Sequence, residues 1–301
     1  MPIPYTRGEN HGSYVWDPPI KDLPRDLDKL QPRQFTVDRT ATRRKLDLAA
    51  EVFDGLLQPR LRSNPWWSLG LTWDAILLVG LEGFMLAMYD QPEAVHRLMA
   101  FLRDDRMRLL DWLEREGLVV PTNGSNYVGS GGVGFTTELP DESANRPLTC
   151  ADIWGFAESQ ETVGVSPEMF AEFILPYQLP LLSRFGLNCY GCCEPVHSRI
   201  DHLIKIPRLR RISVSPWCDQ QAIADRLGNR CIFSRKPNPA PVCVDFDEDV
   251  IRKDLRTTLG IAGKLPLEII MKDTHTVQND PTRLSRWVSI ALEEVNRYVG
   301  G

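Results

Sequence analysis

Residues 189–195 read Cys189-Tyr190-Gly191-Cys192-Cys193-Glu194-Pro195, between an apolar stretch and a helical pattern. Three thiols and a carboxylate therefore lie at one transition from strand to helix. Thiolate sulfur and carboxylate oxygen are ligand types that Zn²⁺ accepts, and a catalytic zinc takes about three protein ligands and leaves one position open. We expect the chemistry of the protein at this junction, which has the donor types to hold a metal.

The chain beyond this junction alternates between helical and strand patterns. Pro195 opens a helix, because proline is favoured at the first helical position. Further strands are expected at residues 211–215, 231–234 and 267–271, and further helices at residues 219–228, 250–259 and from Asp280 onward. Repeated β-α units with continuous apolar strands predict an α/β fold with a parallel sheet.

The chain before the junction is less regular. Residues 1–34 contain repeated prolines and little apolar periodicity, so we predict an irregular arm there and a folded domain over residues 35–301. Residues 66–72 are expected to form a strand, and a long apolar stripe predicts a helix from Pro92 to Gly117. The glycine-rich stretch 123–134 does not connect a strand to a helix as a dinucleotide fingerprint does, so we interpret it as a flexible loop without a cofactor.

Composition restricts the class of protein. With 301 residues and 43% hydrophobic content, the chain can bury a large core. A net charge of -5 argues against nucleic acid and anionic membrane as partners. No stretch approaches the roughly 20 apolar residues of a membrane span, and the N-terminus lacks the pattern of a signal peptide. We therefore expect a cytoplasmic protein whose seven cysteines stay reduced.

Polar residues follow three of the expected strands. They are Cys192-Cys193-Glu194, Arg235-Lys236-Pro237-Asn238 and Lys272-Asp273-Thr274-His275. Active sites of parallel α/β folds lie at the C-terminal ends of the strands. If the sheet closes as a barrel, the first and last groups meet across its mouth, where His275 completes a site begun by Cys192 and Glu194.

Two passages carry a resemblance to a known family. The first is Ser166-Pro167-Glu168-Met169-Phe170-Ala171-Glu172-Phe173-Ile174-Leu175-Pro176-Tyr177, and the second runs from Gly228-Asn229-Arg230-Cys231 to Asn238-Pro239. In both, the chain resembles the uroporphyrinogen decarboxylase superfamily, which also contains corrinoid-dependent methyltransferases. The resemblance implies a TIM-type (β/α)8 barrel. The region before Trp66 supplies fewer β-α units than a complete barrel needs, so we expect the first units to be absent and their edge to be covered by the arm or by a second subunit of a homodimer.

The methyltransferase branch is the better match at the junction. Its members carry a zinc-binding H-x-C-G motif after the equivalent strand, whereas the arginine-rich segment with which the decarboxylases bind substrate carboxylates has no counterpart here. The resemblance thus implies zinc-assisted methyl transfer between a small methylated substrate and the corrinoid of a partner protein. Because no histidine precedes the thiols in this chain, we expect Cys192, Glu194 and His275 to hold the zinc, with Cys189 or Cys193 as substitute ligands.

Three further residues are catalytic candidates. Glu158 and Glu161 precede the Ser166 helix, where they are placed to orient substrate or donate a proton, and Lys236 follows a strand. Structural roles stand beside these functional ones: Glu194 as a helix cap, His275 as a loop contact, Glu158 and Glu161 as surface charges, and Lys236 as a charge at a helix end. Two other functions also stay open, namely uroporphyrinogen III decarboxylase and a noncatalytic relative.

Overall fold

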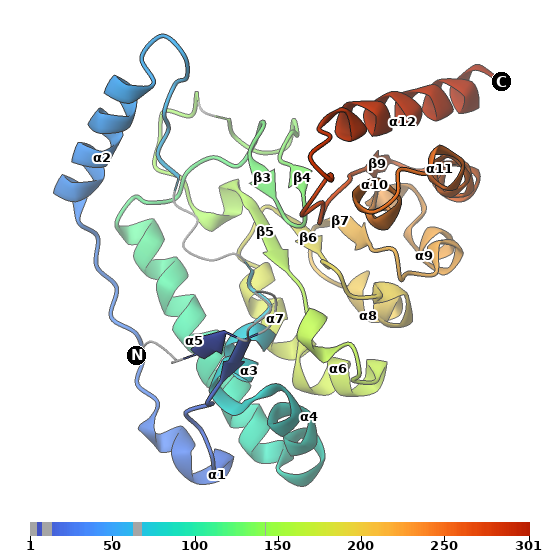
Figure 1. The fold of residues 1–301 in the computed structure, drawn as a ribbon. Coiled ribbons are helices and arrows are strands. Elements are labelled where there is room, and N and C mark those ends of the chain that lie inside the picture. Colours follow the sequence, from blue (N-terminus) through green and yellow to red (C-terminus); the bar gives the residue numbers. More distant parts are fainter. Residues whose placement is uncertain (1–4, 8–13, 63–67, 142) are drawn as a thin grey trace.

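The computed structural model describes residues 5–7, 14–62, 68–141 and 143–301. The part before the main sheet is largely helical, and the part that follows alternates strands and helices (Figure 1). The first part contains β1 (Tyr5–Arg7), β2 (Tyr14–Trp16), α1 (Leu23–Asp26), η1 (Leu27–Lys29), α2 (Arg39–Val52), α3 (Thr72–Val79), α4 (Leu81–Asp90), α5 (Pro92–Arg115), β3 (Tyr127–Val128), β4 (Gly132–Val133) and η2 (Cys150–Asp152).

The second part is built around one parallel sheet. Its elements are β5 (Trp154–Ala157), η3 (Gln160–Thr162), α6 (Pro167–Phe173), α7 (Leu175–Leu182), β6 (Leu187–Tyr190), η4 (Val196–Arg199), α8 (Ile200–Leu203), β7 (Leu209–Val214), α9 (Gln220–Leu227), η5 (Gly228–Arg230), β8 (Ile232–Arg235), α10 (Ala240–Cys243), α11 (Glu248–Ala262), β9 (Leu267–Ile269) and α12 (Thr282–Gly300). The helices begin where the sequence supplies caps: the side chains of Ser166, Asp219 and Asp247 accept backbone N–H bonds at the starts of α6, α9 and α11.

The five strands pair in the order β5-β6-β7-β8-β9, all parallel. The predicted α/β class is confirmed. Each strand is added next to its predecessor, as in barrels, whereas the order reverses in doubly wound sheets. No further strand of this sheet lies in the described ranges, so the closed eight-stranded barrel is not confirmed.

The prediction of a strand at residues 66–72 was wrong over its described part. Trp66 and Trp67 lie outside the described residues, while the part from Ser68 onward is not a strand and Thr72 already belongs to α3. Leu71 has a φ of 65°, a left-handed conformation that ends any extended backbone. The Leu69 N–H donates to the Phe156 carbonyl at 2.8 Å and ties this segment to β5.

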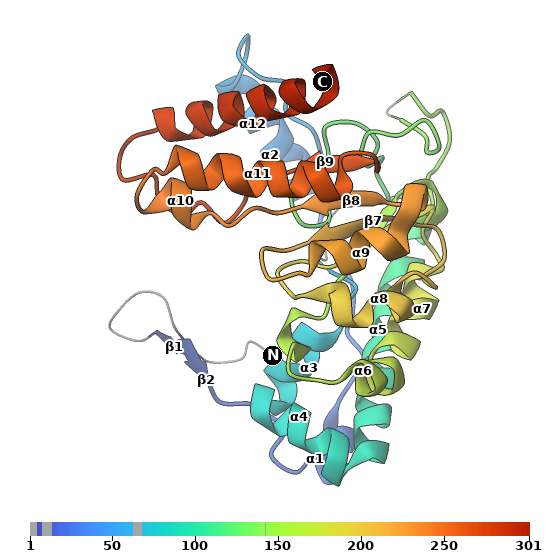
Figure 2. The same ribbon diagram turned by 90° about the vertical axis from the view of Figure 1, so that its right-hand side faces the viewer.

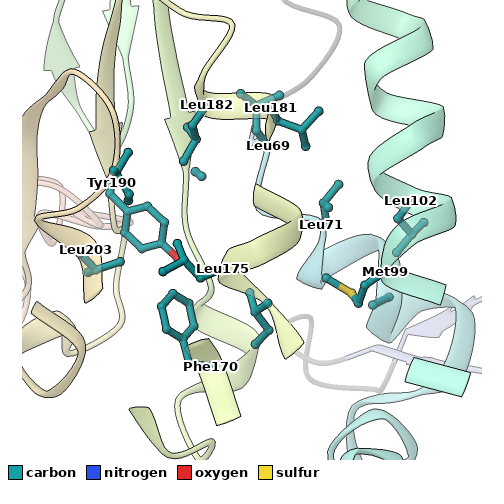
Figure 3. Close-up of a cluster of buried hydrophobic side chains, with 14 of the residues drawn as sticks. Leu69, Leu71, Met99, Leu102, Phe170, Leu175, Leu181, Leu182, Tyr190 and Leu203 are labelled. Atoms are coloured by element: carbon teal, nitrogen blue, oxygen red, sulfur yellow. The ribbon is translucent and has the colours of Figure 1, made fainter. Parts of the chain in front are cut away.

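Helices cover one face of the sheet (Figure 2). Tyr190, Ile212 and Phe233 point to this face and join the main hydrophobic core. Figure 3 shows Tyr190 beside Phe170 and Leu203, with Met99 and Leu102 of α5 farther along the same core. The apolar stripe predicted for α5 is buried as expected, and each fully buried leucine side chain contributes about 1.5–3 kcal/mol to stability.

The opposite face is covered by the segment between α5 and β5. Val128 and Leu139 of this segment pack against Trp154, Phe156 and Leu187 of the sheet. The stretch interpreted as a flexible loop is therefore a packed antiparallel hairpin, β3–β4. Close packing explains one of its glycines, because a Cβ on Gly129, whose φ is +66°, would lie 2.5 Å from the Cys189 sulfur.

The second half of the predicted arm contacts the folded domain. Ile20, Leu23 and Leu27 are buried in the main core, and Ile20 N–H donates to the Leu78 carbonyl at 3.0 Å. By contrast, α2 has no buried residue. Among the described helices, none is both long and apolar enough to cross a membrane alone; α3 and α4 reach the required length and composition only together, and they meet at a bend of 95°.

Candidate active site

The C-terminal ends of β5, β6 and β7 meet at one edge of the sheet, and an open pocket of about 550 Å³ lies there. It is lined by Gln160, Glu161, Val163, Cys193, Glu194, Pro195 and Trp217. Residues from the ends of three successive strands thus share one cavity, in the place where parallel α/β folds carry their active sites.

The turn after β6 is held by its own carboxylate. Glu194 is buried, and its two oxygens accept backbone N–H bonds from Ser159 at 3.0 Å and from Cys192 at 2.8 Å. Burial raises the pKa of Glu194, and these two bonds oppose that rise. Gly191 allows the turn, because its φ is +93° and a Cβ there would lie 3.1 Å from Val196. Glu194 therefore ties the turn after β6 to the end of β5.

This turn places two thiols and an ammonium together. Cys192 Sγ and Cys193 Sγ lie 3.6 Å apart, and Lys272 Nζ lies 3.6 Å from the first and 3.2 Å from the second. Ser130 of the β3–β4 hairpin donates to Cys192 Sγ at 3.3 Å. Cys192 is buried and Cys193 is exposed. The exposed sulfur is therefore the one that a reagent can reach.

The two thiols differ in acidity. The hydrogen bond that Cys192 donates lowers the pKa of Cys193 to about 6, with the Lys272 ammonium acting in the same direction and partial burial against it. The same bond, together with burial, raises the pKa of Cys192. Burial disfavours the charge of Lys272, yet the adjacent sulfurs raise its pKa above the usual value. The pair is thus a thiolate at Cys193 beside an ammonium at Lys272.

The metal site expected from the sequence is not assembled in this geometry. No three His, Cys, Asp or Glu side chains converge as a ligand set in the described part of the chain. Both Glu194 oxygens already accept backbone bonds, His275 is exposed, and Cys189 is buried on β6 behind the hairpin. Lys272 brings a positive charge to the thiols, where the bound cation was expected. The residues present therefore do not fit the zinc ion that we expected.

The group of polar residues after β9 was correctly expected to meet the thiols, but through a different side chain. Lys272, not His275, reaches them, and the Asp273 carboxylate lies 3.2 Å from Lys272 Nζ and 3.9 Å from Cys193 Sγ. The sequence reasoning also missed Ser130, which it placed in a flexible loop. The glycines around Ser130 permit its close approach to the sheet, and they were the sequence feature that could have identified this residue.

The candidates Glu158 and Glu161 lie beside the pocket. Glu161 lines it, and Glu161 Oε2 accepts a bond of 2.7 Å from the Thr72 hydroxyl. Glu158 is 1% exposed; one oxygen accepts from Gln160 N–H at 3.0 Å and the other is buried without a hydrogen-bond partner. Burial, followed by the charges of Glu161 and Glu194, raises the pKa of Glu158 to about 8. The structure thus gathers three carboxylates behind and beside Cys193.

Lys236 lies away from the pocket. It is 2% exposed, and its ammonium donates to the Ser234 carbonyl at 3.2 Å and to the Ser234 hydroxyl. Burial lowers the pKa of Lys236 to about 8. Nearby on the same face, Arg211 and Glu268 form an ion pair at 2.7 Å, and the Arg211 guanidinium lies 4.9 Å from the Trp154 ring centroid. This inner cluster is a second polar site that the sequence did not predict.

Comparison with known proteins supports the fold. No protein-family model matches the sequence, and no curated protein matches it. Among solved structures, the chain is similar to a methyltransferase from Methanosarcina mazei, with a TM-score of 0.56 and 12% sequence identity over 99% of this chain and 76% of that chain. At this level of identity the likeness concerns the fold: the chain has the α/β architecture of a solved methyltransferase.

Proposed function

We propose that this protein is a methyltransferase whose Cys193 thiolate accepts the methyl group during transfer. The observation that carries the proposal is the pair of Cys193 Sγ and Lys272 Nζ, 3.2 Å apart at the edge of the pocket. The thiolate is the nucleophilic form of cysteine, and a neighbouring ammonium stabilises it. In the transfer a bond forms between sulfur and the methyl carbon while the bond from that carbon to its donor breaks.

The fold likeness supports this class of reaction, since the similar solved structure is named a methyltransferase. The Ser166–Tyr177 passage and the sequential strand order support membership of the uroporphyrinogen decarboxylase superfamily. In this proposal the five-stranded sheet is the part of a (β/α)8 barrel that carries the site. A corrinoid held by a partner protein is the second methyl carrier that the sequence resemblance implies.

Zinc has no part in the steps that we propose. Its expected ligand Glu194 is committed to the backbone, and the Lys272 ammonium lies against both thiols. The ammonium supplies the positive charge that favours a thiolate, which is one of the effects of a bound metal cation. The methyl-transfer chemistry therefore remains, but lysine activates the sulfur.

The alternative function as a uroporphyrinogen decarboxylase is less well supported by the charges of the pocket. Such an enzyme binds substrate carboxylates, which need cationic partners. Glu161 and Glu194 line the pocket, and no Lys, Arg or His is among the lining residues in the described part of the chain. Like charges repel, so we favour methyl transfer.

The proposal is tested with methylcobalamin as the methyl donor and the full chain as the acceptor. We expect mass spectrometry to find one added methyl group on Cys193, and Cys193→Ala to abolish methylation. Cys243→Ala, which removes a buried thiol outside the pocket, is the matched control and should react normally. Unchanged methylation of the Cys193→Ala protein would overturn the proposal, as would turnover of uroporphyrinogen.

Metal analysis of the same preparations tests whether Lys272, and not a metal ion, activates the Cys193 thiolate. We expect zinc well below one ion per chain in the active protein. A full equivalent of zinc that is lost in a Cys192→Ala variant would show that a metal, and not Lys272, activates the thiolate.

A further inference from the structure

The pocket beside Cys193 combines negative charge with an exposed aromatic ring. Glu161 and Glu194 bring carboxylates to its wall, and Val163 and Pro195 add apolar surface. Trp217, in the loop after β7, is 69% exposed although it lines the pocket. A large aromatic side chain left open to solvent at a cavity is suited to a ligand that covers it.

The negative charge of this region is not neutralised at the pocket itself. Glu161 lines the pocket, accepts a bond from the neutral Thr72 hydroxyl and forms no ion pair within the described residues. Glu158 lies behind the wall, where burial raises its pKa to about 8, so it adds little negative charge at neutral pH. Arg199 is the cation whose charge acts on Glu194, but its guanidinium donates to the carbonyls of Thr162 and Val165 and does not line the pocket. Lys272 is engaged with the thiols. A cationic ligand would therefore complete the charge balance of the cavity.

We propose that the pocket binds a small methylated onium ion, with the methyl groups on positively charged nitrogen or sulfur, as the methyl donor for Cys193. This inference rests on the proposed function and names its substrate class. The indole face of Trp217 attracts such a cation through its ring quadrupole, and Glu161 supplies the opposite charge. Val163 and Pro195 match the apolar methyl groups, and the volume of about 550 Å³ suits a small molecule.

The reaction balances without another reactant. The Cys193 thiolate attacks one methyl carbon, so that a C–S bond forms and the bond from carbon to the onium nitrogen or sulfur breaks. The electron pair of the broken bond stays on that atom, which leaves as a neutral amine or thioether. One negative and one positive charge are thereby removed, and no proton moves.

Binding is tested by calorimetry on the Cys193→Ala variant of the full chain, which cannot react. The probe is choline, and its neutral carbon isostere 3,3-dimethyl-1-butanol is the matched control ligand. We expect choline to bind at least about tenfold more tightly, because only the charged compound gains from the indole and the carboxylate. Trimethylsulfonium, as a second cation, shows whether nitrogen or sulfur is preferred.

Two substitutions locate the site. Trp217→Ala should weaken choline binding about two- to fivefold, which is the worth of a cation–π contact at a site open to solvent. Glu161→Gln should also weaken choline binding, while the affinity for the neutral isostere stays unchanged. Tyr89→Ala removes an exposed aromatic ring on α4 and should have no effect.

Equal binding of choline and its isostere, or binding unaffected by both substitutions, would overturn the onium site. If methylcobalamin still methylates Cys193 in that case, the proposed function stands and only the donor class is wrong. If choline binds as expected but no onium compound methylates Cys193 in the unsubstituted protein, its role as donor is overturned.

Discussion

Two regions of this protein place a lysine next to cysteine, and the lysines behave in opposite ways. Lys236 lies on the inner face of the sheet near Cys189, where burial lowers its pKa to about 8. Lys272 lies at the end of the sheet beside Cys192 and Cys193, whose sulfurs raise its pKa against the effect of burial. Lysine and cysteine thus form a charged pair only at the end of the sheet, where the cysteine is exposed and can lose its proton.

The surroundings explain this difference. Burial raises the pKa of Cys189, so this thiol offers Lys236 no full negative charge. In the same inner cluster, Glu268 is already paired with Arg211 and accepts from the Ser234 hydroxyl. At the edge, Cys193 is open to solvent and accepts from both Cys192 and Lys272. The inner cluster is therefore structural, whereas the thiolate at the edge is available to react.

The largest expected effect concerns the stability of the inner cluster. Glu268→Gln leaves the buried guanidinium of Arg211 without its counter-charge, so the free energy of unfolding should fall by about 3 kcal/mol. Urea denaturation measures this loss of unfolding free energy. The control is Glu138→Gln, which breaks an exposed pair with Arg210 and should cost less than about 1 kcal/mol. Equal losses in the two variants would mean that the inner pair is no more structural than a surface pair.

A smaller effect is expected when Lys236 is replaced by methionine. In the unfolded chain the lysine keeps its proton up to its usual pKa of 10.5, whereas in the folded chain its pKa is about 8. The lysine therefore destabilises the fold below pH 8, and the unsubstituted protein gains stability as the pH rises from 8 to 10.5. Lys236→Met should raise the unfolding free energy by about 2 kcal/mol at pH 7.

The pH dependence checks this second prediction. Urea denaturation at pH 7 and pH 10 should show that the advantage of the Lys236→Met variant shrinks at the higher pH. An advantage that grows with pH, or a loss of stability at pH 7, would contradict the view that Lys236 is a buried charge without a full counter-charge.

The smallest expected effect concerns the thiolate at the edge. Lys272→Met removes the ammonium beside Cys193, so the midpoint pH of its alkylation by iodoacetamide should rise from near 6, and the rate at pH 7 should fall about tenfold. Lys205→Met, at an exposed position elsewhere, is the control. An unchanged midpoint in Lys272→Met would show that the Cys192 hydrogen bond alone holds the thiolate.

Much of the fold could be predicted because its signals are local. The strands expected at residues 211–215, 231–234 and 267–271 correspond to β7, β8 and β9, and the long helix after Pro92 is α5. The last helix shows the limit of such reasoning: its apolar spacing predicts that Leu284, Trp287 and Val288 are all buried, but only Trp287 of these three is buried, while Leu284 and Val288 are exposed. Periodicity indicates that a helix has an apolar face, whereas its neighbours decide which residues of that face are covered.

The sequence predicted which two segments approach each other at the candidate site, but not which side chains make the contact. The turn after β6 and the segment after β9 meet as expected: all five parallel strands end at the same edge of the sheet, and Lys272 reaches the thiols although β7 and β8 lie between the two segments. Which residue of Lys272-Asp273-Thr274-His275 points to the thiols depends on the loop backbone, where Asp273 has a positive φ of 59°. Glu194 has the chemistry of a metal ligand, but its oxygens accept backbone bonds from Ser159 at the end of β5 and from Cys192 within the same turn.

The order of residues by itself determined the helices, the parallel strands and the presence of reactive thiols at one strand end, because hydrophobic periodicity, caps and turns act between near neighbours in the chain. Only the tertiary structure decided that Lys272 approaches Cys193, that the β3–β4 hairpin covers Cys189, and that carboxylates and Trp217 line a common pocket. Those arrangements join residues up to 142 positions apart, as in the bond from Lys272 to Ser130. Burial and charge at such distances follow from packing, which no local pattern encodes.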